Sequence, residues 1–222
     1  MPDYRRAKTP GATYFFTLVS YQRRPMLCHD SVRVALRDAI TVVRREHPFT
    51  IEAWVLLPDH LHCIWTLPEH DHAYSVRWSM IKRLVTQRVG AHGAPYCCGS
   101  TQDMPHQRRS VGAHGAPYNA SQQNGRVRRA HQTHRDHTNE SASRSKRREG
   151  AIWQRRFWEH RIRGQADLNR CIDYLHWNPV KHGHVNRVFD WPYSTFQRFV
   201  RQGLYPVDWG GQGVIEDGAF GE

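Results

Sequence analysis

The sequence has no long apolar run, no cysteine pattern typical of a disulfide framework, and few acidic residues for its number of basic ones. No segment of the 222 residues approaches the roughly 20 apolar residues that a membrane-spanning helix needs. The first residues, Met-Pro-Asp-Tyr-Arg-Arg, lack the apolar stretch of a signal peptide. Five scattered cysteines suit a reducing compartment. We therefore expect a cytoplasmic protein without membrane partners.

The shortage of acidic residues leaves the chain strongly basic. It holds 32 Lys plus Arg against 20 Asp plus Glu, for a formal net charge of +12. This excess favours a polyanionic partner, because each phosphate that is neutralised releases counterions. The alternative is a basic surface that is merely solvated.

Residues 90–149 differ from the rest of the chain in composition. They are rich in Gly, Ser, Gln, Asn, Arg and His and poor in large aliphatic residues, so they cannot bury enough apolar surface to fold alone. They carry 10 Lys plus Arg and 4 Asp plus Glu, hence +6, and the rest of the chain keeps 12 − 6 = +6. We predict one catalytic domain formed by residues 1–89 and 150–210, a low-complexity basic insertion at 90–149, and a tail at 211–222.

Hydrophobic periodicity predicts alternating strands and helices outside the insertion. β-Branched and aromatic residues indicate strands at 13–20, 49–57, 60–67 and 152–162. Helices with apolar stripes are expected to begin at Ser31, Ser75 and Asp167, and the last should stop before Pro179. The order strand, helix, strand, strand, helix, strand, helix indicates an α+β fold in which helices pack on an antiparallel sheet.

An eight-residue repeat lies at the start of the insertion. Val-Gly-Ala-His-Gly-Ala-Pro-Tyr occurs at 89–96 and again at 111–118. Its core can be encoded by GGT GCG CAC GGC GCA CCC, which contains GGTGCGC, a short ACG loop and the complementary arm GCGCACC. One interpretation is that palindromic DNA repeats were inserted into the coding sequence and are translated in frame. The other is tandem duplication of a protein linker.

His60 and His62 are the sharpest chemical signal in the sequence. On a strand, alternate side chains share a face, so these two project together while Leu61 and Cys63 point into the core. Two imidazoles about 7 Å apart along a strand can share one divalent ion. In a chain with 16 histidines, the alternative is an ordinary surface pair.

The helix that begins near Asp167 offers a nucleophile and a third metal ligand. Tyr174 lies beside its apolar stripe, and Asn178 follows four residues later on the same side. The Tyr174 phenol can attack a phosphodiester, and the Asn178 carbonyl can bind a metal. The alternative is that Tyr174 packs at the helix edge and Asn178 caps its end. No general base is identifiable.

Four segments together resemble the REP-associated tyrosine transposases, which belong to the single-tyrosine, His-hydrophobic-His transposases. They are Leu-Pro-Asp-His-Leu-His-Cys-Ile-Trp at 57–65, Trp-Gln-Arg-Arg-Phe-Trp-Glu-His at 153–160, Asp-Tyr-Leu-His-Trp-Asn-Pro-Val-Lys-His-Gly at 173–183, and Trp-Pro-Tyr-Ser-Thr-Phe at 191–196. The resemblance covers about residues 4–89 and 150–210, in order. The long insertion is the main departure from the family pattern.

The resemblance implies a ferredoxin-like domain that cleaves and rejoins single-stranded DNA at hairpin-forming repetitive extragenic palindromes. It implies that Tyr174 forms a 5′-phosphotyrosine intermediate and that His60, His62 and Asn178 hold Mg²⁺ or Mn²⁺, although related transposases place Gln at the position of Asn178. A monomer or homodimer associated with the nucleoid is expected.

Basic and aromatic residues near the proposed site are candidates for nucleic-acid binding. Cations mixed with aromatics suit a groove where bases stack and phosphates are neutralised. The candidates are Arg5, Arg6, Arg155, Arg156, Trp158, Arg161, Arg163, Lys181 and His182. Two other function classes stay open: a catalytically inactive DNA- or RNA-hairpin-binding protein, and a metal-dependent nuclease that acts through water.

Overall fold

The computed structural model describes residues 8–91 and 152–210, which belong to one compact unit. Arg5, Arg6, the tail at 211–222 and the predicted insertion beyond residue 91, with its second repeat, lie outside the described residues. Among the residues that are described, no helix is long and apolar enough to cross a membrane.

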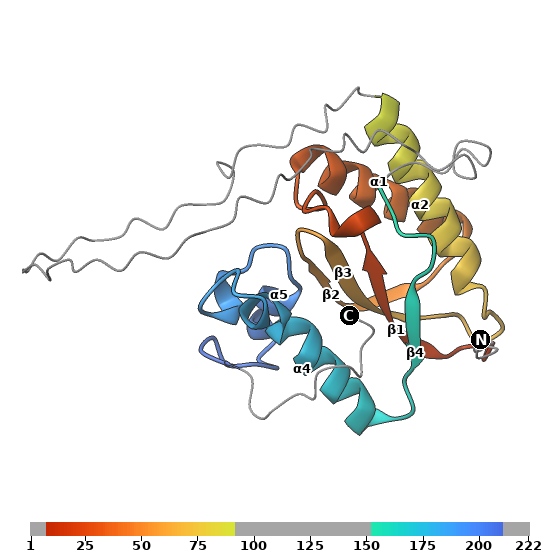
Figure 1. Cartoon of the computed structure of the whole chain (residues 1–222). Coiled ribbons are helices and arrows are strands. Elements are labelled where there is room, and N and C mark those ends of the chain that lie inside the picture. Colours follow the sequence, from red (N-terminus) through yellow and green to blue (C-terminus); the bar gives the residue numbers. More distant parts are fainter. Residues whose placement is uncertain (1–7, 92–151, 211–222) are drawn as a thin grey trace, which may run out of the picture. The chain divides into compact units, whose positions relative to one another are not determined.

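A four-stranded antiparallel sheet forms the centre of the fold (Figure 1). Its elements in chain order are β1 (Thr13–Val19), α1 (Asp30–Glu46), β2 (Thr50–Leu56), β3 (His60–Thr66), α2 (Tyr74–Ala91) and β4 (Trp158–Arg161). The spatial order is β2-β3-β1-β4, and all three neighbouring pairs are antiparallel. This order and connectivity confirm the predicted ferredoxin-like α+β fold.

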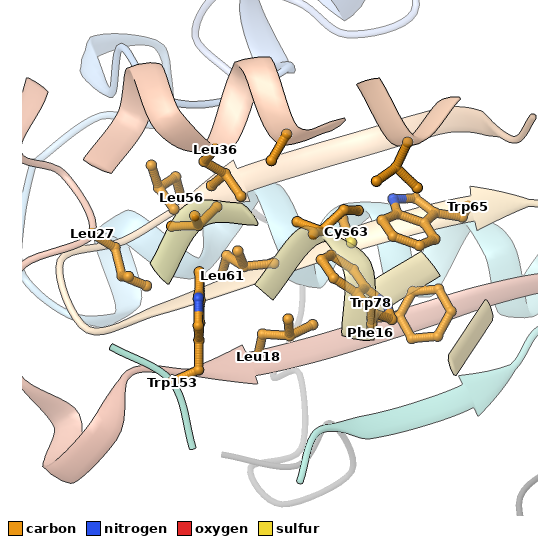
Figure 2. Close-up of a cluster of buried hydrophobic side chains, with 14 of the residues drawn as sticks. Phe16, Leu18, Leu27, Leu36, Leu56, Leu61, Cys63, Trp65, Trp78 and Trp153 are labelled. Atoms are coloured by element: carbon orange, nitrogen blue, oxygen red, sulfur yellow. The ribbon is translucent and has the colours of Figure 1, made fainter. Parts of the chain in front are cut away.

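Helices α1 and α2 cover one face of the sheet (Figure 1). Side chains that alternate along β1 and β3, including Phe16, Leu18, Leu61 and Trp65, point into this layer because successive residues of a strand face opposite ways. Trp78 of α2 stacks on Trp65 with ring centroids 4.0 Å apart. Figure 2 shows the labelled members of this core: Phe16, Leu18, Leu27, Leu36, Leu56, Leu61, Cys63, Trp65, Trp78 and Trp153.

Helix α4 (Gln165–Lys181) packs on the opposite face, against β2 and β3. Phe15, Val55 and Ile64 point from the strands into this second core, where Cys171 and Leu175 of α4 meet them. Three short helices complete the described chain: η1 (Tyr21–Arg23), η2 (Val188–Asp190) and α5 (Phe196–Arg201). Because both faces of the sheet are covered, the side chains of both faces of β3 are buried.

The segment that joins η2 to α5 protects the outer edge of β2. The Leu56 N–H donates to the Tyr193 carbonyl at 2.9 Å, and the Thr195 N–H donates to the Trp54 carbonyl at 2.9 Å. The Trp191 indole N–H donates to the Leu56 carbonyl at 2.9 Å. These bonds occupy outward-facing backbone groups of Trp54 and Leu56, so this end of the edge strand offers them to no further strand.

The predicted strand at 152–162 is only partly a strand. Residues Trp158–Arg161 form β4, and Trp153 makes an isolated bridge with Ser20. Between them the chain leaves the ladder, so the aromatic and β-branched composition overestimated the strand length.

The predicted helix boundaries also shift. α1 begins at Asp30 with His29 as its N-cap, and α2 begins at Tyr74, so Ser31 and Ser75 lie inside their helices. Asp167 is the third residue of α4, where its carboxylate accepts the Arg163 N–H at 3.0 Å. One or two residues of error at a helix end are usual for pattern-based prediction.

The predicted stop before Pro179 is wrong, because α4 continues to Lys181 with Pro179 inside it. Pro179 has no N–H to donate to the carbonyl of residue 175, so one hydrogen bond of the helix is missing. Backbone hydrogen bonds from residues that follow the helix hold its last turn in place. The His182 N–H donates to the Asn178 carbonyl at 3.0 Å, and the His184 N–H donates to the Pro179 carbonyl at 2.9 Å. Asn178 therefore keeps a helical position.

A buried guanidinium fastens the start of α2 to the connection between α1 and β2. Arg77, fully buried, donates to the Asp71 carboxylate at 2.6 Å, to the Pro48 carbonyl at 2.9 Å and to the His47 carbonyl at 3.2 Å. We expect Asp71→Asn to lower the free energy of unfolding by about 3 kcal/mol, because it leaves a buried charge without its counter-ion. Urea denaturation measures this loss.

The control is Asp30→Asn, which removes the partner of Arg33 in a pair whose Asp30 side chain is 86% exposed. We expect a loss of about 0.5 kcal/mol or less for this exposed pair. Equal losses for the two variants would contradict the assigned role of the buried pair.

Acid should weaken the same interaction. The hydrogen bond from Arg77, partly opposed by burial, lowers the pKa of Asp71 below its ordinary value. A lowered folded-state pKa gives stability that is complete above the unfolded pKa of about 3.9 and is lost as the pH falls through the folded value. The difference in unfolding free energy between the native protein and Asp71→Asn should therefore shrink as the pH falls below about 4.

Candidate functional site

His60 and His62 face α4 from adjacent same-face positions on β3. Both side chains are buried, and their ring centroids lie 4.9 Å apart. The residue between them, Leu61, points into the core beneath α1 and α2. The strand alternation predicted from the sequence is therefore the arrangement that the fold adopts.

The Nδ1 atom of each histidine is held by a neighbouring side chain. His60 Nδ1 lies 2.7 Å from Asp59 Oδ1, and His62 Nδ1 lies 2.9 Å from Thr17 Oγ1 on β1. Burial alone would raise the pKa of Asp59, but its hydrogen bond with His60 and its contact with Arg23 lower the pKa to about 2. Asp59 is therefore an anion that orients the His60 ring, as the outer-shell partner of a metal-binding histidine does.

Asn178 brings an oxygen to the same place. Its side chain is buried on α4, and its Oδ1 lies 3.3 Å from His60 Nε2. Two ligands of one ion with bonds of about 2.1 Å are separated by roughly 3.0–3.4 Å, so this distance fits a shared metal. Two imidazole nitrogens and one amide oxygen suit Mn²⁺ better than Mg²⁺, which prefers an all-oxygen shell.

Tyr174 lies one helical turn before Asn178, next to His62. Its ring centroid is 5.5 Å from that of His62 and 6.1 Å from that of Phe15, and its side chain is buried. Lys181 approaches the phenol from the end of the helix, where its Nζ donates to the Tyr174 oxygen at 3.3 Å. The structure thus brings together the four residues predicted as nucleophile and metal ligands.

His182 and Trp158 lie near two members of this group. The exposed His182 ring lies 5.1 Å from that of His60. Half-buried Trp158 pairs with Thr17 in the β1–β4 register, and Thr17 in turn pairs with His62. His182 is thus placed beside His60, and Trp158 lies one strand away from His62 in the sheet.

The remaining basic candidates follow the β4 edge. Arg155 and Arg156 are exposed just before β4, Arg161 ends the strand, and Arg163 lies in the turn that leads to α4. Arg161 Nη1 donates to Thr9 Oγ1 at 3.2 Å. These cations extend along one side of the sheet.

A second group of metal-type donors lies at the start of α4. One donor atom from each of His160, Asp167 and Cys171 lies within 4.8 Å of the others. However, the Asp167 oxygens already accept from His160, Arg163 and Arg170, and burial raises the pKa of the Cys171 thiol to about 12. This group joins β4 to the first turn of α4 through the Asp167 carboxylate.

Sequence reasoning missed the side chains that position the two histidines. Asp59 is adjacent to His60 in the chain and was readable from the Pro-Asp-His motif. The role of Thr17 could not be predicted from the sequence, because its contact with His62 depends on the register between β1 and β3.

Comparisons with known proteins place the chain in a family. No family model matches it. It is 37% identical over 222 residues to a REP-associated tyrosine transposase of Escherichia coli, covering 100% of this chain and 98% of that protein. It is 36% identical over 211 residues to a putative REP-associated tyrosine transposase of Haemophilus influenzae, covering 95% and 94%.

A solved structure agrees. It is described as a REP-associated tyrosine transposase bound to a REP hairpin, and it matches with a TM-score of 0.66 and 36% identity over 100% of this chain and 98% of that one. Relatives that are this similar over their full length establish the family. The chain belongs to the REP-associated tyrosine transposases, a family of DNA-cleaving enzymes.

Proposed function

We propose that this protein cleaves and rejoins single-stranded DNA at hairpin-forming palindromes, with Tyr174 as nucleophile. The observation that carries the proposal is the convergence of His60, His62, Tyr174 and Asn178 at one point between β3 and α4. The match to a relative solved with a REP hairpin supports the choice of substrate. The catalytic domain would comprise residues 1–89 and 150–210.

In the proposed cleavage step, the Tyr174 oxygen attacks the phosphorus of a phosphodiester. The bond from phosphorus to the 3′ oxygen breaks, the phenol loses its proton, and the 3′ oxygen gains one. The downstream strand is left attached to Tyr174 through its 5′ phosphate, as a 5′-phosphotyrosine, and the upstream strand leaves with a 3′ hydroxyl. In rejoining, a 3′ hydroxyl attacks the same phosphorus and releases the tyrosine.

His60, His62 and Asn178 would hold Mg²⁺ or Mn²⁺. The bound cation would polarise a phosphate oxygen and stabilise the charge that develops there. Asp59 and Thr17 would fix the two rings so that Nε2 is the nitrogen presented to the ion.

Residues around the site would bind the DNA. Trp158 offers a face on which a base can stack, and the cations along β4 would neutralise phosphates. Lys181 and His182 follow Tyr174 at the end of α4 and are candidates for contacts with the scissile phosphate, and Arg5 and Arg6 are candidates for contacts with flanking DNA. Because the Tyr174 side chain is buried, a phosphodiester reaches its oxygen only after neighbouring groups have moved.

The first test uses a single-stranded oligonucleotide that carries GGTGCGC-ACG-GCGCACC with flanking bases, incubated with Mn²⁺. We expect the native protein to form a covalent adduct on a denaturing gel, and we expect Tyr174→Phe to reduce adduct by about a thousand-fold or more while the hairpin Kd stays within about twofold.

The two rival functions predict different products. Hairpin binding without adduct or cut product, across metals and flanking sequences, would identify a binding module. Cut product that persists in Tyr174→Phe would identify a nuclease that acts through water.

A second prediction concerns Asp59, which positions His60 without being a metal ligand. We expect Asp59→Asn to weaken Mn²⁺ binding by about 10- to 100-fold, because the His60 ring loses its anionic partner. Titrating cleavage against Mn²⁺ concentration measures this shift, and saturating Mn²⁺ should restore most of the rate. An unchanged Mn²⁺ midpoint would refute the positioning role.

A further inference from the structure

We propose that Lys181 is a catalytic residue that stabilises the negative charge on the Tyr174 oxygen during cleavage and rejoining. This inference rests on the proposed function, because it assigns a role at the same reacting atom. It differs from a contact with the scissile phosphate, which is the role that the sequence indicated for Lys181.

The contact itself is the first support. Lys181 Nζ lies 3.3 Å from the Tyr174 oxygen and 5.0 Å from the centroid of its ring. The distance is at the long end for a hydrogen bond, and catalytic hydrogen bonds often tighten only when the charge of the transition state develops. Lys181 is half-buried, so its interaction is less screened than that of an exposed lysine.

The position of Lys181 on α4 is the second support. Residues four and seven places after Tyr174 lie on the same side of a helix with 3.6 residues per turn, so Tyr174, Asn178 and Lys181 form one stripe. This alignment exists because α4 continues through Pro179. A helix that stopped at Asn178 would not fix the lysine in line with the phenol.

The chemistry needs such a donor twice. In cleavage, the tyrosine oxygen loses its proton as its bond to phosphorus forms. In rejoining, the 3′ hydroxyl forms a bond to phosphorus, the bond from phosphorus to the Tyr174 oxygen breaks, and the electron pair stays on that oxygen. An ammonium that donates to the same oxygen stabilises the charge in both directions, and hydrogen bonds between ionised groups are the strong ones.

On the side of the Tyr174 ring that faces the sheet, the neighbouring groups include aromatic rings. The Tyr174 ring lies near the His62 and Phe15 rings on that side, and His62 is proposed as a metal ligand. Lys181 provides a hydrogen-bond donor to the phenol oxygen from the nucleophile's own helix.

The test compares Lys181→Met, Lys181→Arg and the native protein on the hairpin oligonucleotide. We expect Lys181→Met to slow both adduct formation and rejoining by about 100-fold, as the loss of one charge-stabilising donor typically does. The hairpin Kd should change no more than in Arg37→Met, which removes one exposed cation from α1 on the other face of the sheet. Lys181→Arg should restore at least a tenth of the native rate.

Two results would overturn the inference. One is native rates in Lys181→Met, and the other is a rate loss that saturating DNA fully reverses, which would assign Lys181 to DNA binding. In either case adduct formation by the native protein, and its absence in Tyr174→Phe, would leave the proposed function standing.

A measurement that does not depend on cleavage separates the two proposals further. With tyrosine labelled at ¹³Cζ, the Tyr174 resonance is identified by its loss in Tyr174→Phe. We expect this resonance to shift in Lys181→Met and to stay in place in Arg37→Met. An unshifted Tyr174 resonance in Lys181→Met would show that the contact does not exist in solution and would reject the inference.

Discussion

The structure depends on strand β3 being covered on both faces. A strand with one face in water needs apolar residues at every second position only, whereas β3 must supply side chains to two layers. Leu61, Cys63 and Trp65 fill the core beneath α1 and α2, and Ile64 joins the core beneath α4. His60 and His62 occupy the α4 side, where polar partners replace apolar contacts. A shift of one residue in the β3 register would exchange the two sets, placing imidazoles in the hydrophobic core.

Helix α4 supplies the complementary constraint. One side of it carries Cys171 and Leu175, which hold it against the sheet, and the adjoining stripe carries the polar residues of the site. Packing of the apolar side thus sets the height of Tyr174 and Asn178 above β3. Buried polar groups in such a place must be satisfied, and each of the two histidines has a hydrogen-bonded partner at Nδ1.

Much of this arrangement was predictable from local pattern. Strand alternation placed His60 and His62 on one face, and helical spacing placed Tyr174 and Asn178 on one side. Family resemblance, rather than periodicity, supplied the ferredoxin-like topology. The extent of β4 was not predictable, because hydrogen bonding to β1, and not composition, determines where it begins. The continuation of α4 through Pro179 was missed for a similar reason: propensity disfavours it, but the turn that follows, with the His184 N–H bonded to the Pro179 carbonyl, compensates.

Thr17 illustrates a different limit. Its contact with His62 joins residues 45 positions apart, and only the register of β1 against β3 reveals it. The segment at 191–196 was recognised as a family motif, yet its role in covering the β2 edge became clear only from its backbone hydrogen bonds.

The connection between α2 and β4 separates the site into two parts along the chain. His60 and His62 precede residues 92–151, and Tyr174 and Asn178 follow them. For a flexible chain, joining two paired elements through 60 residues costs only about 2 kcal/mol more in closure entropy than joining them through six. A chain cut between Ala91 and Ile152 would carry the imidazoles on one piece and the tyrosine on the other, with the β1–β4 ladder and the packing of α4 on β2 and β3 to hold them together.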